Sequence, residues 1–219
     1  MLTVDLMSSP TPSQTEILQA LRNEGTDALA QHFNQVRERL KQIVRFRMDY
    51  RLNGRVSESD VIQEAYVRAA DRLDRFLEQE EPPPFFVWLR REVTQRLQEV
   101  HRFHFTSQQR DVRREASLPP ATGSAETSLA LAAHLVAQIT SPSQCVERAE
   151  QIAHLESTLN GMDALDREVI ALRHFEELSN QETAEVLNIA PAAASKRYLR
   201  ALHRLRQIML SLGGPDATA

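Results

Sequence analysis

Apolar residues recur at spacings of three and four along most of this chain, which is the period of an amphipathic helix. The pattern predicts a helical segment that begins near Thr15 and continues to Met48. A second predicted helix opens at Ser57 and runs over 57–73, and a third covers 85–104. No segment gives a strong strand signal, and Leu, Ala, Glu, Arg and Gln favour helices over sheets. The sequence therefore predicts an all-α fold.

The helical pattern stops in the middle of the chain. Residues 106–142 include Pro119-Pro120 and Gly123-Ser124, together with a stretch rich in Ser, Thr and Ala. Such a composition is typical of a flexible linker, within which a transient helix is expected around Leu129 to Ile139. The predicted organisation has a disordered leader, two small helical domains on either side of the linker, and a tail. These segments are 1–14 (leader), 15–105 (first domain), 106–142 (linker), 143–212 (second domain) and 213–219 (tail).

The composition restricts the cellular setting and the kind of partner. The 219 residues include one cysteine, so no internal disulfide can form, which fits a reducing compartment. No apolar run is long enough to insert into a membrane, and the N-terminus lacks the basic start of a secretory signal. We therefore expect a cytoplasmic protein. The net charge of −4 argues against a protein that coats nucleic acid by charge alone.

The charges nevertheless alternate in blocks along the first predicted domain. Residues 37–55 hold seven basic and two acidic side chains, whereas 58–64 holds three acidic side chains and no basic one. Residues 90–114 again hold seven basic side chains, against three acidic ones. The alternation indicates two kinds of partner surface, one for nucleic acid and one for protein.

The C-terminal region has the pattern of a helix-turn-helix. Ser179 is a plausible N-cap, and Glu182 completes a capping box. Asn188 tolerates the left-handed conformation that a tight turn needs, and Pro191 suits the first turn of the next helix. From 191 to 210 the chain has five basic residues and no acidic one, which predicts a cationic helix that enters a DNA major groove.

Three segments lie in the order that is found in bacterial sigma factors. Segment 59–73, with Asp60, Gln63, Glu64 and Tyr66, resembles the core-binding helix of region two in the extracytoplasmic-function (ECF) group. Segment 85–104 resembles the adjoining promoter-melting helix, and segment 161–206 resembles region four. The resemblance implies a sigma region 2 domain and a sigma region 4 domain, the latter with the helix-turn-helix.

The resemblance also implies what the protein does. A sigma factor is a specificity subunit, not an enzyme: it binds core RNA polymerase and directs promoter-specific transcription initiation. Its expected partners are core RNA polymerase and promoter DNA, with an anti-sigma factor as a further candidate. Asp60, Gln63 and Glu64 are the expected core polymerase contacts, because the spacing places them on one helical face.

The expected DNA contacts lie on two helices. On the 85–104 helix, the expected minus-ten contacts share one face; they are Arg91, Gln95, Gln98 and Arg102. Trp88 of the same helix is expected in the core. On the C-terminal helix, Ser195, Lys196 and Arg200 are the leading minus-thirty-five contacts. Arg197 and Arg204 are expected to bind phosphates, which position a protein on DNA without reading its sequence.

Two other functions compete with this interpretation. An autonomous helix-turn-helix regulator would explain the C-terminal domain but not the 59–73 or 85–104 segments. A helical adaptor without DNA binding would explain the acidic helix but not the basic block. No metal or other cofactor is expected, since His101 and His104 have no Cys, Asp or Glu cluster beside them.

Overall fold

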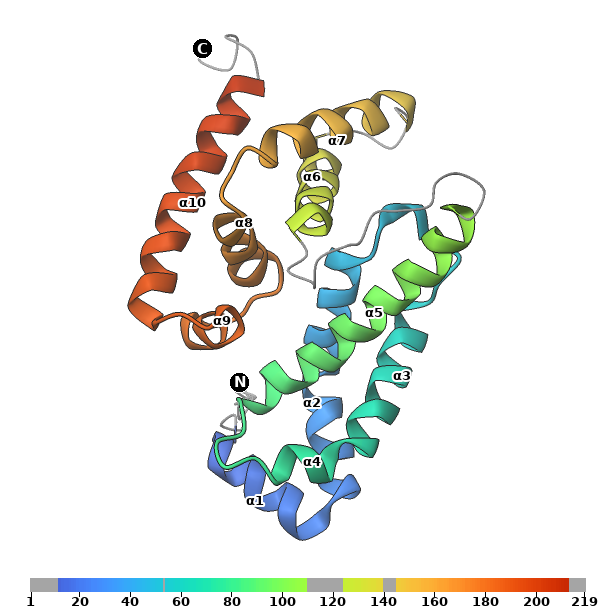
Figure 1. Cartoon of the computed structure of the whole chain (residues 1–219), viewed down its shortest axis with the longest axis vertical. Helices are drawn as coiled ribbons and strands as arrows, with labels where there is room; N and C mark the ends of the chain where they lie inside the picture. The colour runs from blue at the N-terminus through green and yellow to red at the C-terminus, as the bar shows by residue number, and fades with distance from the viewer. Residues whose placement is uncertain (1–11, 53, 110–123, 140–144, 213–219) are drawn as a thin grey trace, which may run out of the picture.

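The computed structural model describes residues 12–52, 54–109, 124–139 and 145–212. Every regular element in these ranges is helical, which confirms the predicted all-α fold. The helices form two groups that lie side by side in Figure 1. The N-terminal group consists of α1 (Gln14–Glu24), α2 (Thr26–Arg47), the 3-10 turn η1 (Tyr50–Leu52), α3 (Glu58–Asp71), α4 (Leu73–Leu77) and α5 (Phe85–Gln109).

The second group, which we call the C-terminal group, ends in the longest of its helices. Its apolar core, in which Leu131, Leu159 and Ile170 are fully buried, also includes Phe46 of α2. Its elements are α6 (Ser124–Ile139), α7 (Cys145–Leu159), α8 (Ala164–Ile170), the π-helical turn η2 (Ala171–Phe175), α9 (Asn180–Leu187) and α10 (Pro191–Leu212).

The core of the N-terminal group lies between α2, α3 and α5. Trp88 is 1% exposed and stacks on Phe76, with ring centroids 4.2 Å apart, so the expectation that Trp88 belongs to the core is confirmed. Val93, Leu97 and Val100 of α5 are also buried, as their spacing indicated. These residues take up one side of α5, and Arg91, Gln95 and Arg102 on its other side are exposed.

The first helical segment is divided where the sequence pattern predicted continuity. Gly25 separates α1 from α2 and has φ +58° and ψ −125°, a conformation that L side chains rarely adopt. Its N–H still donates to the Leu21 carbonyl at 3.0 Å, which closes the last turn of α1. The apolar period continues across the break, so only the glycine itself signalled a helix end.

The helix starts agree with the capping chemistry of the sequence. The Ser57 side chain accepts from the Ser59 N–H, and the Asp163 carboxylate accepts from the Leu165 N–H at 2.9 Å. At α9, Ser179 and Glu182 form the complete predicted capping box. These caps fix where α3, α8 and α9 begin.

Helix α6 lies within 106–142, the range for which the sequence predicted a linker. Leu131, Ala132 and Val136 of α6 are buried in the core of the C-terminal group, so this helix is packed where a transient one was expected. The Ser- and Thr-rich start of α6 favours a loop, but burial of its apolar face stabilises the helix. Residues 1–11, 110–123, 140–144 and 213–219, which hold most of the predicted leader, part of the predicted linker and the predicted tail, lie outside the described ranges. The division into domains stays a prediction.

Arg167 connects α8 to the end of α7. Its guanidinium Nη1 donates to the main-chain carbonyls of Leu159 at 3.0 Å, Asn160 at 3.3 Å and Met162 at 2.5 Å, and the residue is 4% exposed. Burial lowers the pKa of this arginine. Carbonyls at a helix C-terminus need donors from outside the helix, so Arg167 supplies what the α7 backbone cannot.

We expect Arg167→Leu to lower the free energy of unfolding by about 2 to 4 kcal/mol, because buried carbonyls lose a charged donor. Urea unfolding followed by circular dichroism measures this change. Arg206→Leu, at an exposed position of α10, is the matched control. A loss below about 0.5 kcal/mol for Arg167→Leu, as for ordinary surface substitutions, would contradict the role of this side chain.

Among the described residues, no helix has the length and apolar character that crossing a bilayer requires.

Candidate nucleic-acid and protein interfaces

The predicted core-binding residues lie on the outer face of α3. Asp60, Gln63 and Glu64 are all exposed, whereas the neighbouring Val61, Ile62 and Ala65 are buried. The buried residues fix the rotation of the helix, so that the acidic side chains point away from the core.

The α3 face has an apolar member in addition to the predicted polar contacts. Val67 is 53% exposed and follows Glu64 by three residues, which places both on the same face. An exposed valine beside carboxylates gives the face an apolar contact as well as charge. The helical spacing from Asp60 could have identified this residue.

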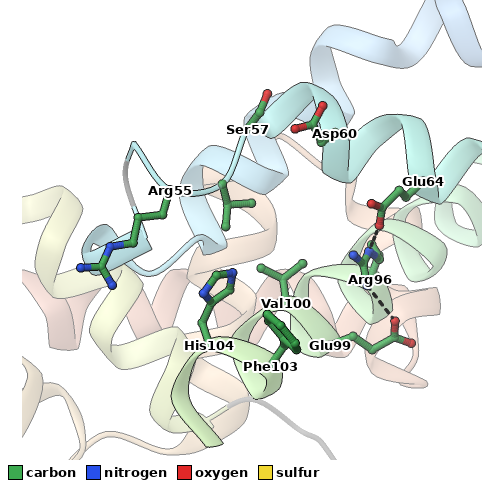
Figure 2. Close-up of a pocket in the computed structure, with 10 residues that line it drawn as sticks. Arg55, Ser57, Asp60, Glu64, Arg96, Glu99, Val100, Phe103 and His104 are labelled. Carbon is green, nitrogen blue, oxygen red and sulfur yellow. Dashed lines mark hydrogen bonds and ion pairs between the residues drawn. The ribbon is translucent and has the colours of Figure 1, made fainter. Parts of the chain in front are cut away.

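A groove of about 530 Å³ runs between the start of α3 and the C-terminal half of α5 (Figure 2). Glu64 forms an ion pair across it with Arg96 of α5. Arg96 also contacts Glu99 at 3.2 Å, and Arg68 binds Glu99 through two hydrogen bonds of 2.7 and 2.5 Å. The hydrogen bonds from Arg68 lower the pKa of Glu99. Phe103 lies at this groove and is 74% exposed.

The predicted minus-ten residues share the outer side of α5. Arg91, Gln95 and Arg102 are exposed, and Gln98 is half-buried. Gln95 Oε1 accepts a hydrogen bond of 3.2 Å from Arg72, which holds the amide in place. The structure thus presents two cations and two amides along one face, a combination that can contact phosphates and base edges.

The turn between α9 and α10 has the predicted geometry. Asn188 adopts φ 51° and ψ 49°, the left-handed conformation, and the Ile189 N–H donates to the Ala184 carbonyl at 3.0 Å. The Asn180 side chain donates to the Pro191 carbonyl at 2.8 Å and braces the start of α10. Ala184 and Ala194 are buried, so the two helices approach closely.

The outer face of α10 carries the predicted minus-thirty-five residues. Ser195, Lys196, Arg200 and Arg204 are exposed. Leu199 lies among them and is 66% exposed, although the sequence analysis did not select it. Its position, three residues after Lys196, was the signal that could have identified it.

Arg197 differs from the other basic residues of α10. It is half-buried, and its Nη1 binds Asp166 of α8 at 2.8 Å and Asp163, the N-cap of α8, at 3.3 Å. The guanidinium thus anchors α10 to α8 in this structure, although the sequence analysis expected it to bind a phosphate. Its acidic partners lie more than thirty residues earlier, so no local pattern of α10 indicated them.

Within the described ranges, no group of three or more His, Cys, Asp or Glu side chains could hold a metal ion. His101 Nε2 instead accepts a hydrogen bond of 3.3 Å from the Asp49 N–H. This contact ties the loop after α2 to α5.

The profile of the ECF sigma factor family matches residues 12–209. The chain belongs to the ECF sigma factor family. Members of this family direct transcription initiation and are regulatory proteins rather than enzymes, and the resemblance seen in the sequence is confirmed.

Individual relatives agree with the family. The RNA polymerase sigma factor CnrH of Cupriavidus metallidurans is 30% identical over 150 residues, which are 68% of this chain and 72% of CnrH. The probable RNA polymerase sigma factor RfaY of Xanthomonas campestris is 31% identical over 158 residues, which are 70% of this chain but only 34% of RfaY. The chain thus matches about a third of RfaY.

A solved structure of CnrH, in complex with the cytosolic domain of CnrY, has the same kind of fold. The two structures agree with a TM-score of 0.50 at 24% identity, and the match covers 90% of this chain and 97% of that one. This likeness supports the all-α arrangement of the ECF sigma factor described here.

Proposed function

We propose that this sigma factor binds core RNA polymerase through the outer face of α3 and promoter DNA through α5 and α10. The observation that carries the proposal is the separation of charge. The acidic face of α3 and the basic face of α10 are both exposed, and they lie on different helical groups (Figure 1). One chain can therefore bind polymerase and DNA with different surfaces.

The α3 face suits a basic protein surface. Asp60 and Gln63 supply an exposed carboxylate and amide, and Glu64 is half-exposed despite its pair with Arg96. Charge-assisted hydrogen bonds from arginine or lysine would give this contact its specificity. Val67 adds apolar area at the same place. In this proposal Asp60 is the central contact, since its side chain is exposed and lines the groove.

The α5 face suits the minus-ten element. Arg91 and Arg102 contact phosphates, and Gln95 and Gln98 contact base edges, in the mode expected for cationic and amide side chains. Trp88 is buried and does not take part. Because α5 resembles the promoter-melting helix, we assign this face to the DNA strand that separates at the minus-ten element.

The α10 face suits the minus-thirty-five element. We assign base contacts to Ser195, Lys196 and Arg200, and a phosphate contact to Arg204. Leu199 joins them, because an exposed leucine in a major groove contacts thymine methyl groups. Arg197 is left out of this set and assigned a positioning role, since Asp163 and Asp166 already neutralise it.

The remaining expectations follow from the same proposal. We place the protein in the cytoplasm, where core polymerase acts. We keep the division into two domains, with α6 assigned to the second domain because Leu131 and Val136 are buried in its core. An anti-sigma factor remains a predicted partner. CnrH, the relative with 30% identity, has been solved in complex with the cytosolic domain of CnrY.

Co-elution with purified core polymerase in size-exclusion chromatography tests the first half of the proposal. We expect a stoichiometric complex that assembles without DNA. A chain that stays separate from core polymerase but retains a specific DNA fragment would instead support an autonomous regulator. A chain that binds neither would favour the adaptor function.

A further inference from the structure

The side-chain amide of Gln95, on the proposed minus-ten face of α5, has a partner on another helix pair. Its Oε1 accepts a hydrogen bond of 3.2 Å from Arg72 Nη1. Arg72 is the residue between α3 and α4, where it is the C-cap of the first and the N-cap of the second. Gln95 is exposed, so this contact lies on the surface that α5 would present to promoter DNA.

Arg72 is held through both its main chain and its side chain. Its N–H donates to the Arg68 carbonyl at 3.1 Å, and its own carbonyl accepts from the Phe76 N–H at 3.0 Å. The Nη1 atom that binds Gln95 also lies 2.6 Å from Glu92 Oε2 on α5. Because a terminal guanidinium nitrogen carries two N–H bonds, Nη1 can donate to both acceptors at once.

Glu92 keeps the guanidinium of Arg72 in this position. The Glu92 side chain is 1% exposed, and within the described part of the chain its Oε1 has no hydrogen-bond partner. Movement of Arg72 away from Glu92 would leave a buried carboxylate without the cation that compensates it. Arg72 therefore stays on Glu92, and its second N–H stays directed at Gln95.

The chemistry of Arg72 decides which atom of the Gln95 amide is left for DNA. A guanidinium has N–H donors and no acceptor, so only the amide oxygen can face it. The Nε2 group lies on the other side of the amide carbon and is directed away from Arg72. Gln95 thus offers a base its N–H donors, while its carbonyl oxygen is already engaged.

This orientation distinguishes bases by the group at one position of their edge. A glutamine with a freely rotating amide suits adenine, because it donates to N7 and accepts from the N6 amino group. N–H donors alone suit the keto oxygens, O6 of guanine and O4 of thymine. Adenine and cytosine have an amino group there instead, so their own N–H donors would face those of Gln95.

We propose that Arg72, held by Glu92, orients Gln95 as a hydrogen-bond donor and makes one position of the minus-ten element selective for guanine or thymine. Arg72 and Glu92 are positioning residues in this proposal, and neither contacts DNA. The inference rests on the proposed function, in which Gln95 contacts base edges.

Transcription from a randomised minus-ten element tests the proposal. Holoenzyme assembled from core polymerase and the full chain transcribes barcoded copies of one promoter that it uses, in which only the minus-ten element varies. At one position we expect guanine and thymine to exceed adenine and cytosine by about tenfold, the value of one specific contact. Gln95→Ala should remove the preference at that position and so identifies the base that Gln95 contacts.

Removal of the positioning pair should relax the same preference. Arg72→Met with Glu92→Met takes away both charges, so no buried charge is left unpaired. The ratio of keto to amino bases should fall below about threefold, because the freed amide can also pair with adenine. The matched control, Arg68→Met with Glu99→Met, removes another arginine–glutamate pair between α3 and α5, with hydrogen bonds of 2.7 and 2.5 Å. It should keep the ratio.

A single isosteric variant gives a result that loss of structure could not imitate. Gln95→Glu keeps an acceptor for Arg72 but replaces the N–H donors by a second acceptor. The preference should therefore reverse, towards the amino groups of adenine and cytosine. A Gln95→Glu holoenzyme that still prefers guanine or thymine would overturn the proposal.

The base preferences also separate this inference from the proposed function. If Gln95→Ala changes the preference but a folded Arg72→Met, Glu92→Met variant does not, the positioning role is wrong and the base contact stands. A uniform loss of transcription from all templates, with an unchanged ratio, would likewise overturn the positioning role. If Gln95→Ala changes no position, the proposed base contact of Gln95 fails, and the inference fails with it.

Discussion

Reversal of the two exposed carboxylates on α3, by Asp60→Arg with Glu64→Arg, is expected to weaken binding to core polymerase by about 100-fold or more. Loss of one partner from an interfacial charge pair costs about 2 to 5 kcal/mol, and each 1.4 kcal/mol is a factor of ten. Promoter-specific initiation should fall accordingly. Titration of fluorescently labelled protein with core polymerase measures the loss.

The fold should tolerate this change. Asp60 is exposed, and the pair between Glu64 and Arg96 is partly exposed, so its loss costs about 1 kcal/mol or less. Asp74→Arg with Glu78→Arg reverses two other exposed carboxylates, on α4 and at its C-terminal cap, and is the matched control. Equal polymerase affinity for the two double variants would show that α3 is not the docking face.

Reversal of charge on α10, by Lys196→Glu with Arg200→Glu, should abolish use of promoters that depend on the minus-thirty-five element. Each specific base contact contributes about 1 to 3 kcal/mol, and the new carboxylates also repel phosphates, so a loss of about 100-fold or more is expected. Binding to core polymerase should be unchanged, because α3 lies on the other helical group. Initiation at a fixed promoter, with saturating core polymerase, measures this effect.

Two single variants separate the roles of the basic residues. Arg204→Gln should weaken binding to all promoters alike and reduce the salt slope by about one unit, as loss of one phosphate contact does. Arg197→Gln should instead lower stability and leave the salt slope unchanged, because Asp163 and Asp166 already bind this guanidinium. If a stably folded Arg197→Gln variant showed a reduced salt slope of promoter binding, Arg197 would contact a phosphate, as the sequence predicted.

Local chemistry predicted the parts of the fold that depend on neighbours in sequence. The capping box of Ser179 and Glu182, the left-handed Asn188 and the N-cap at Ser57 all have the predicted form. Each is fixed by a side chain acting on its own backbone within a few residues. The orientation of α3 and α5 followed similarly from the apolar period.

Other features depend on residues far apart and left no local signal. Helix α6 is stable because Leu131 and Val136 enter a core built by later helices. Arg47 binds Glu176, which lies 129 positions later in the chain, and nothing near either residue indicated the other. The break at Gly25 is different, since a glycine was present to signal it, but the uninterrupted apolar period outweighed that signal.

The apolar pattern of the sequence also did not predict which apolar side chains are exposed to solvent. Leu199 and Val67 occupy outer faces of helices, where a sequence pattern treats leucine and valine as core residues. Both lie beside residues that the sequence did select, Lys196 and Glu64. The structure thus extends each predicted surface by an apolar member that charge and motif alone would not include.

Multi-round transcription over a pooled library of genomic fragments, with core polymerase and with or without this protein, shows whether the chain directs initiation at specific promoters. We expect discrete start sites that require both components and disappear with Asp60→Arg and Glu64→Arg. They should also disappear with Lys196→Glu and Arg200→Glu. An unchanged set of start sites, in the presence of a folded protein that binds DNA fragments without polymerase, would contradict this expectation.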